Sequence, residues 1–456
     1  MATEILFETK RFAKSRMLLL LASVALAVLL LALAVSERPA SAAFPGKNGK
    51  IAFVSTRDGN EEIYVMDADG TNETRLTTDP ETEPGRDIHP MFSPDGKRLT
   101  FTRRPFIGGV TEETIYVMDP IDVNPADGSG DNLVKLTPAP SPNFMSAYSP
   151  DGSQMVFLRQ EPPGSDNEIW VMDADGTNPV QLTDNSLLES RPVFSPDGTK
   201  IVYARRGLPG TPASIRQLDV YVMNANGTEQ TRLTTSLAND NNPRFSPDGE
   251  KIAFESTRNG SSDIYVMNPN GTGQTPLISY PDSTEQFPAF SPDGERLAFT
   301  SDRDGNEEIY VIDLDGTADP VRLTETMPPA ENTRVDWGPF LYDFDGFHRP
   351  VDNPPTLNEV KAGSAVPVKF SLGGDQGLGI LAAGYPKSQR IDCDSAAPVD
   401  ILEQIATAGE SGLSYDTATG EYTYVWKTGK AWEGTCRQLV VKLDDATDHR
   451  ARFMFK

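Results

Sequence analysis

Short apolar runs bounded by turn residues recur along most of the chain. A strand-like phrase, Ile63-Tyr64-Val65-Met66-Asp67 in its first copy, occurs six times. The later copies begin at Ile115, Ile169, Val220, Ile264 and Ile309. Five-residue runs that are rich in β-branched and aromatic residues, each followed by a turn signal, predict β-strands. The pattern therefore predicts an all-β chain that is built from repeats.

Each repeat also carries a Ser-Pro-Asp-Gly turn, in which proline presets φ and glycine accepts a positive φ. The phrase begins at Ser93, Ser149, Ser195, Ser246 and Ser291, and a degenerate sixth copy is Trp337-Gly338-Pro339. A second turn follows the strand phrase, as in Asp67-Ala68-Asp69-Gly70, and a short strand then ends in Arg-Leu-Thr. We interpret Asp-x-Asp-Gly as a hairpin turn. A calcium loop is the alternative, although the glycine and glutamate of an EF-hand are not in place.

Four antiparallel strands in each repeat of about fifty residues are typical of a propeller blade. The first repeat lacks its own first strand, because Phe44 is followed almost directly by Lys50-Ile51-Ala52-Phe53. The last repeat is followed by an extra strand-like segment, residues 333–337. We infer that this segment completes the first blade. The prediction is a six-bladed β-propeller over residues 44–340 that has no open sheet edge.

The repeat phrases resemble the WD40-like (PD40) repeat of TolB-type propellers. One copy of Phe-Ser-Pro-Asp-Gly-x-x-Ile-Ala-Phe begins at Phe245, and Ile-Tyr-Val-Met-Asp-x-Asp-Gly begins at Ile63. The resemblance covers roughly residues 44–340. It implies a six-bladed propeller whose first strands are innermost, in an exported bacterial protein.

A different domain is predicted for residues 341–456, where the repeats stop. Alternating apolar runs at 365–372 and 439–443 predict a β-sandwich-like, immunoglobulin-like domain. Both cysteines of the chain, Cys393 and Cys436, lie in this segment. In an exported chain an even pair indicates a disulfide, and two free buried thiols are the alternative.

This C-terminal segment resembles the PxKF domain of exported bacterial proteins. Pro367, Lys369 and Phe370 match the residues that give the domain its name, and Tyr424-Val425-Trp426-Lys427-Thr428 matches a further phrase. The resemblance implies an accessory module and supplies no catalytic residue.

Residues 1–43 have the pattern of an export signal. Basic residues between Lys10 and Arg16 precede an apolar run over 17–35, and small residues follow at Ala40-Ser41-Ala42. This order is typical of a cleaved secretory signal. The apolar run is also about long enough to span a bilayer, so an uncleaved signal anchor is the alternative. In both cases the remainder is expected to be secreted or associated with the cell envelope.

The composition excludes several classes of partner and chemistry. The formal charge of −25 at pH 7 disfavours nucleic acid and anionic membrane surfaces, both of which need a basic face. The chain has three histidines, which is too few for histidine-rich metal catalysis. It also lacks the Gly-x-Ser-x-Gly elbow of a serine hydrolase.

One set of polar residues stands five positions before the aromatic residue of each predicted first strand. The set is Asp87, Asn143, Glu189, Asp240, Glu285 and Asn332. If the first strands are innermost, these residues would ring one mouth of the central channel. Oxygen ligands suit a hard cation, so the four acids are candidate metal ligands and Ca²⁺ is the candidate ion. The alternative is that all six face solvent and support the loops. No other cofactor is predicted.

Three functions fit these features. The favoured one is an exported, non-enzymatic propeller that binds a protein or peptide partner at the cell envelope or outside the cell. A glycan- or wall-binding module is the second, and a hydrolase or lyase that uses the acidic ring is the third. Fold alone cannot establish catalysis. A membrane contact is expected only if the N-terminal segment remains as an anchor.

The calcium hypothesis makes a measurable prediction. Calcium should raise the melting temperature of the wild type, and a Glu189→Gln, Glu285→Gln variant should show a smaller rise because it lacks two charged oxygen ligands. Thermal unfolding with and without calcium measures both. A wild type whose melting temperature does not respond to calcium contradicts the hypothesis.

Overall fold

The computed structural model describes most of the chain after residue 47. The described ranges are 48–78, 85–105, 113–119, 133–137, 141–162, 165–207, 217–315, 319–342, 344–382, 384–404, 412–445 and 447–456. The predicted export signal at 1–43 lies outside them. None of the helices in these ranges is long and apolar enough to cross a membrane.

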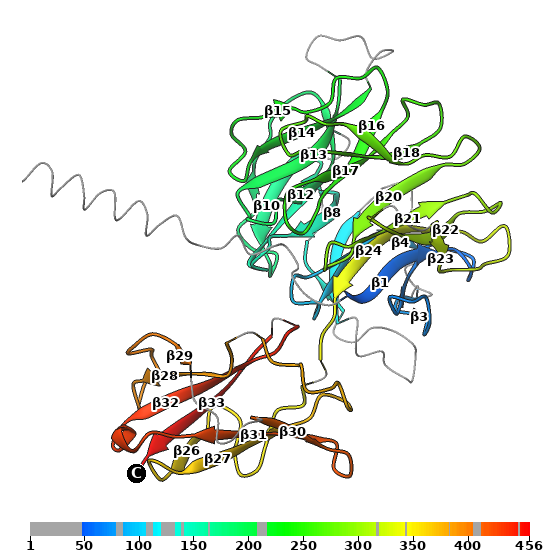
Figure 1. Ribbon diagram of the computed structural model, residues 1–456. Helices are drawn as coiled ribbons and strands as arrows, with labels where there is room; N and C mark the ends of the chain where they lie inside the picture. Colours follow the sequence, from blue (N-terminus) through cyan, green and yellow to red (C-terminus); the bar gives the residue numbers. More distant parts are fainter. Residues whose placement is uncertain are drawn as a thin grey trace, which may run out of the picture. The chain divides into compact units, whose positions relative to one another are not determined.

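Residues 48–339 form six four-stranded sheets within the described ranges (Figure 1). The first strands are β4 (Gly85–Phe92), β8 (Asn143–Tyr148), β12 (Leu188–Phe194), β16 (Asp240–Phe245), β20 (Glu285–Phe290) and β24 (Asn332–Pro339). The second strands are β5 (Leu99–Pro105), β9 (Gln154–Arg159), β13 (Lys200–Arg206), β17 (Ile252–Ser256), β21 (Arg296–Ser301) and β1 (Asn48–Ser55).

The outer half of each sheet consists of a third and a fourth strand, and neighbouring strands of these sheets are antiparallel. The third strands are β6 (Thr114–Met118), β10 (Glu168–Asp173), β14 (Leu218–Asn224), β18 (Asp263–Met267), β22 (Glu308–Asp313) and β2 (Glu62–Met66). The fourth strands are β7 (Val134–Lys135), β11 (Val180–Gln181), β15 (Thr231–Arg232), β19 (Thr275–Ile278), β23 (Val321–Arg322) and β3 (Thr74–Arg75).

The six first strands form a closed cycle, in which each strand contacts the next and β24 contacts β4. The cycle closes because β24 pairs with β1, with Trp337 opposite Ile51 and Asn332 opposite Ser55. The sequence predicted that a strand after the last repeat completes the first sheet, and this pairing confirms it.

Side-chain hydrogen bonds explain why the Ser-Pro-Asp-Gly phrase recurs nearly unchanged. The Ser195 hydroxyl donates to Asp197 Oδ1 at 2.6 Å and accepts the Lys200 N–H at 2.9 Å. Gly198 has a φ of 69°, which glycine adopts without strain. The same serine contacts recur at Ser246 and Ser291. The serine, the aspartate and the glycine of the turn therefore each have a fixed structural task.

The Arg-Leu-Thr phrase holds the fourth strand of a sheet against the third. Thr77 Oγ1 accepts the Ile63 N–H at 2.9 Å and donates to the buried Glu62 carboxylate. Arg75 forms an ion pair with Glu62 at 2.9 Å, and Leu76 is buried in the core. The sixth sheet repeats this arrangement with Thr324, Glu308 and Arg322. The Asp-x-Asp-Gly phrases form the hairpin turns between the third and fourth strands, as in Asp67 to Gly70.

A large ring side chain on each second strand fills the core between sheets. The six are Phe53, Phe101, Phe157, Tyr203, Phe254 and Phe299, and each is at most 1% exposed. Burying one side chain of this size contributes about 2–3 kcal/mol. In the first sheet Phe53 stacks on Tyr64, with ring centres 5.8 Å apart.

The C-terminal region forms two further sheets. One has the strand order β25 (Phe347–His348), β27 (Ala365–Phe370), β31 (Glu421–Lys427) and β30 (Leu413–Asp416). The other has the order β26 (Leu357–Val360), β33 (Asp448–Phe455), β32 (Cys436–Lys442), β28 (Lys387–Ile391) and β29 (Glu403–Gln404). A short 3₁₀ helix, η2 (Lys430–Trp432), precedes β32.

Side chains from both C-terminal sheets share one hydrophobic cluster around Trp426, Phe370 and Phe453. Cys393 and Cys436 form a disulfide with their Cα atoms 5.2 Å apart. This confirms the predicted pairing and removes the alternative of two free thiols.

Loss of the closing strand's largest side chain should destabilise the six-sheet region. Trp337 is 3% exposed, packs with Ile51 and donates from Nε1 to Gly49 O at 3.3 Å. We expect Trp337→Ala to lower the free energy of unfolding by about 3–5 kcal/mol, because a large buried side chain is removed. Val321→Ala, at a position 60% exposed, is the control and should change it by less than about 0.5 kcal/mol. Urea unfolding followed by circular dichroism measures both, and equal midpoints for the two variants would contradict the expectation.

Candidate functional site

Each first strand has a bulge at the same place. Between Ile88 and Met91 the pairing of β4 with β5 shifts register, and His89 inside the shift has a φ of 59°. The other five first strands shift register at the same place. Their residues with positive φ are Met145, Arg191, Asn242, Phe287 and Arg334. None of the six is glycine, although a left-handed backbone costs other residues roughly 1–2 kcal/mol.

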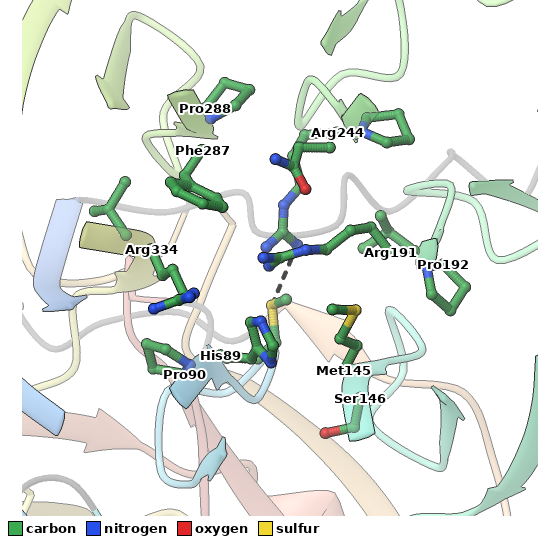
Figure 2. Close-up of a pocket in the computed structure, with 15 residues that line it drawn as sticks. His89, Pro90, Met145, Ser146, Arg191, Pro192, Arg244, Phe287, Pro288 and Arg334 are labelled. Carbon is green, nitrogen blue, oxygen red and sulfur yellow. Dashed lines mark hydrogen bonds between the residues drawn. The ribbon is translucent and has the colours of Figure 1, made fainter. Parts of the chain in front are cut away.

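These six bulge residues line a common cavity between the first strands. A bulge bends its strand and redirects the side chain at that position. Figure 2 shows His89, Arg191, Phe287 and Arg334 reaching this space from separate strands. We call this space the central cavity. It leaves about 30 Å³ in which the centre of a water-sized sphere can move. A space of this kind can hold ordered waters or a small functional group of a ligand.

A second cavity, of about 70 Å³, shares Met91, Val193 and Arg244 with the central cavity. We call it the aromatic cavity, because its wall includes the ring side chain that precedes each Ser-Pro-Asp-Gly turn. These side chains are Phe92, Tyr148, Phe194, Phe245, Phe290 and Trp337. A cavity with three arginines in its wall and a cavity walled mainly by ring side chains therefore adjoin each other between the first strands.

Three arginines bring positive charge to the central cavity. Arg334 forms an ion pair with Glu61 at 2.7 Å, and an Nη atom of Arg244 lies 3.8 Å from Asp336. Arg191 forms no ion pair with any carboxylate of the described residues. Its guanidinium carbon lies 5.1 Å from the centre of the Phe287 ring.

Burial and mutual repulsion perturb the titration of these groups. Burial, followed by repulsion from Arg334 and Arg244, lowers the pKa of Arg191 to about 9. Burial also lowers the pKa of His89 well below its usual range, and the arginines add to the effect, so His89 is neutral at pH 7. Burial raises the pKa of Asp336, which lies beside Arg244. The cavity therefore holds guanidinium groups in a setting that disfavours unpaired charge.

The six residues predicted to ring the channel mouth do not face solvent. Asp87, Asn143, Glu189, Asp240, Glu285 and Asn332 are all buried, with exposures of 0–2%. Four of them accept hydrogen bonds from arginines of their own sheets: Asp87 from Arg103, Asp240 from Arg258, Glu285 from Arg303 and Asn332 from Arg57. Glu189 accepts from Asn185 at 2.6 Å, and Asn143 donates to Ser141 O. These residues fix the framework of each sheet.

The arginines that hold them belong to a set that occurs once in each sheet, within two residues of the end of the second strand. The set is Arg57, Arg103, Arg159, Arg205, Arg258 and Arg303. Each guanidinium lies over the Tyr or Trp ring of the third strand, from 3.8 Å for Arg205 on Tyr221 to 5.2 Å for Arg103 on Tyr116. Arginine suits this role because it stacks by its face and donates hydrogen bonds by its edge.

The contacts do not favour a metal at the predicted ring. Across the ranges that the structure describes, no three His, Cys, Asp or Glu side chains are grouped as a metal site requires. Calcium binding by Asp87, Glu189, Asp240 and Glu285 stays a prediction. Each of these four carboxylates accepts at least one hydrogen bond from the partners described above.

The residues that line the central cavity stand two positions after the predicted ring residues. His89 follows Asp87, Arg191 follows Glu189, and the same offset holds in the other four sheets. One signal in the sequence marks the place. Proline comes directly after four of the six bulge residues, as Pro90, Pro192, Pro243 and Pro288. Within sheets proline is confined to edges and bulges, because it cannot donate to the ladder.

Comparison with known proteins finds local sequence matches. Residues 213–287 match the family model described as PD40, TolB beta propeller domain. A stretch of 51 residues is 53% identical to the Tol-Pal system protein TolB of Geobacter sulfurreducens, over 11% of this chain and 11% of that protein. The corresponding protein of Geobacter metallireducens is 47% identical over 51 residues. The chain thus matches about a tenth of the length of these curated relatives.

Two solved structures show the likeness of fold. TolB from Acinetobacter baumannii is similar with a TM-score of 0.51 and 21% identity, over 64% of this chain and 67% of that one. Hydrazine synthase from Kuenenia stuttgartiensis is similar with a TM-score of 0.52 and 13% identity, over 90% of this chain and 67% of that one. The chain therefore has an all-β, TolB-like propeller fold that is built from antiparallel sheets. The likeness of residues 341–456 to a PxKF domain stays a prediction.

Glu189 should make stability depend on pH. Burial raises the pKa of Glu189 to about 8, and the neighbouring Glu168 adds to the rise. The unfolded carboxyl has a pKa near 4.5, so between these values only the folded state keeps the proton. The free energy of unfolding should therefore fall as the pH rises through this window, by up to a few kcal/mol.

Glu189→Gln removes this titration, so its stability should fall less than that of the wild type between about pH 5 and about pH 8. Urea unfolding at steps across the window measures the difference. Glu250→Gln, at an exposed position, is the control and should follow the wild type. Parallel profiles of unfolding free energy against pH for the wild type and Glu189→Gln would contradict the assignment of this pH dependence to Glu189.

Proposed function

We propose that the chain is an exported, non-enzymatic, six-bladed propeller that binds a segment of a protein or peptide partner in its central cavity. One observation carries the proposal. Six equivalent bulge positions keep a strained backbone, yet they hold five residue types: His, Met, Arg, Asn and Phe, with Arg twice. Backbone strain of this kind is concentrated at functional sites.

The contrast with the surrounding framework supports this reading. Positions with a common structural task, such as Ser195 and Asp197 of the turn or the stacked Arg205, recur almost unchanged from sheet to sheet. The bulge positions share a backbone conformation, but no single residue type is common to them. A varied set of side chains around one cavity is what recognition of an asymmetric ligand requires.

The character of the lining favours an extended segment over a folded surface. The space is narrow, and its wall mixes arginine with Met91, Met145 and Phe287. Methionine adapts its shape to apolar groups, and arginine supplies oriented donors. Such a wall suits one or two side chains of a partner.

The contacts within the cavity give no support to a catalytic role. Ser146 Oγ and His89 Nδ1 make no hydrogen bond to any described residue. No nucleophile of the described lining is therefore joined to a base, as covalent catalysis requires. The hydrolase or lyase hypothesis has no further observation in its favour.

The location at the bacterial envelope or outside the cell is part of the proposal. The Cys393–Cys436 disulfide supports it, because disulfides persist in oxidising compartments. The signal peptide or anchor over 1–43 and a PxKF-type accessory domain over 341–456 complete the proposed organisation.

Selection from a displayed peptide library tests the function. We expect the immobilised protein to enrich peptides whose affinity falls at least about tenfold for Phe287→Ala and for Met145→Ala, since each substitution removes apolar contact area in the cavity. Val321→Ala, on an outer strand, is the control and should bind like the wild type. Failure to enrich any peptide would overturn the proposal, as would enriched peptides that bind all variants equally.

A further inference from the structure

We propose that the ligand group held in the central cavity is a carboxylate attached to an apolar carbon skeleton, as at the C-terminus of a peptide that ends in phenylalanine. The inference rests on the proposed function and specifies the chemistry of its ligand. The carboxylate contacts Arg191, and the apolar group lies in the aromatic cavity.

Arg191 is the cation best placed for this contact. Arg334 pairs with Glu61 and Arg244 is near Asp336, whereas Arg191 has no ion pair among the described residues. Its guanidinium carbon lies over the Phe287 ring, 5.1 Å from the ring centre. A guanidinium that stacks by its face keeps its N–H edge for a two-pronged contact with a carboxylate.

The carboxylates near Arg191 are already engaged. Glu255 Oε1 accepts the Phe287 N–H at 2.6 Å and also accepts the Asn242 amide. Burial raises the pKa of Glu255, which weakens it as a permanent counter-charge. Asp336 Oδ2 accepts the Phe92 N–H at 2.9 Å, and Glu61 is paired. An incoming anion therefore meets a guanidinium whose charge is not neutralised by a direct partner.

An anion matches the charge of the central cavity. The space of about 30 Å³ between the bulge residues accommodates a small group such as a carboxylate. A ligand cation would be repelled by Arg191, Arg244 and Arg334 together.

Further donors surround this space. The imidazole of His89 is neutral, and its buried Nδ1, which donates in the tautomer that carries the proton there, makes no hydrogen bond to a described residue. Arg334 Nε is also buried and makes no hydrogen bond to a described residue. Buried polar atoms usually have partners, and a bound carboxylate supplies acceptor oxygens for them.

The aromatic cavity accounts for the apolar part of the ligand. It shares Arg244 with the central cavity and is lined by ring side chains such as Phe194 and Trp337. Aromatic rings pack well in edge-to-face or offset contacts with one another. A phenyl group next to the carboxylate would lie against this wall.

Small probes test the inference on the purified protein. N-acetylphenylalanine carries the carboxylate and the ring, its amide lacks the charge, and N-acetylglycine lacks the ring. We expect N-acetylphenylalanine to bind at least about tenfold tighter than either, because a charge-assisted pair and a buried ring each contribute on this scale. Calorimetric titration at pH 7 measures the three affinities.

Variants assign the contact to Arg191. Arg191→Gln should weaken the binding of N-acetylphenylalanine at least about tenfold. The affinity of Arg191→Lys should fall between those of the wild type and Arg191→Gln, because lysine keeps the charge and loses the two-pronged geometry. Arg206→Gln, at an exposed position, is the control and should bind like the wild type. If Arg191→Gln lowers the melting temperature, its binding is not compared, and the affinities of the wild type for the acid and for the amide test the inference.

Equal binding of acid and amide overturns the inference, and so does unchanged binding by Arg191→Gln. The outcome is separable from that of the peptide selection. If selected peptides require Phe287 but bind equally well after their carboxylates are amidated, the proposed function stands and the carboxylate site is wrong. If N-acetylphenylalanine binds through Arg191 and no peptide is enriched, the site stands for a free aromatic acid and the peptide function is wrong.

Discussion

The antiparallel pairing of β24 with β1 is the contact on which the remaining architecture depends. It joins the two ends of the repeat region, so that six first strands meet in one cycle. Without it the first sheet would have three strands and an unpaired edge at β1, which is a template for aggregation. Arg334 would also lose its place in the central cavity. The cavity is therefore a property of the closed cycle and of no single sheet.

Within the sheets, opposite charges are neutralised close to where they arise. Arg103 is held between the Asp87 carboxylate and the Tyr116 ring, and Arg258 is placed alike between Asp240 and Tyr265. A buried charge is tolerable when it is paired and hydrogen-bonded in this way. The central cavity departs from this pattern, because Arg191 lacks such a partner among the described residues. A chain of net charge −25 thus places three guanidinium groups together between its first strands.

The sequence predicted the sheets, the turns and the closing strand because these depend on local chemistry. A Ser-Pro-Asp-Gly turn needs its hydroxyl, carboxylate and glycine wherever it occurs, and apolar runs mark the strands between turns. The disulfide was predictable because the chain has two cysteines and the pattern of its first residues predicts export. The bulge residues that line the central cavity stand two positions after the ring that the sequence predicted. Alternation in a regular strand puts residues such as Glu189 and Arg191 on the same face. A bulge breaks this alternation, and at non-glycine residues it leaves no compositional mark except the prolines beside it.

Each sheet contributes one bulge residue to the cavity, while its turn, its arginine stack and its outer edge are held by other residues. The residue in the cavity can therefore change while the turn, the arginine stack and the outer edge of its sheet keep their own contacts. Duplication of a repeat copies the framework, and later substitution at a single codon changes what the copy presents. The fold thus separates the inheritance of shape from the inheritance of specificity, and descendants of one ancestral propeller can diverge in ligand while remaining nearly identical in architecture.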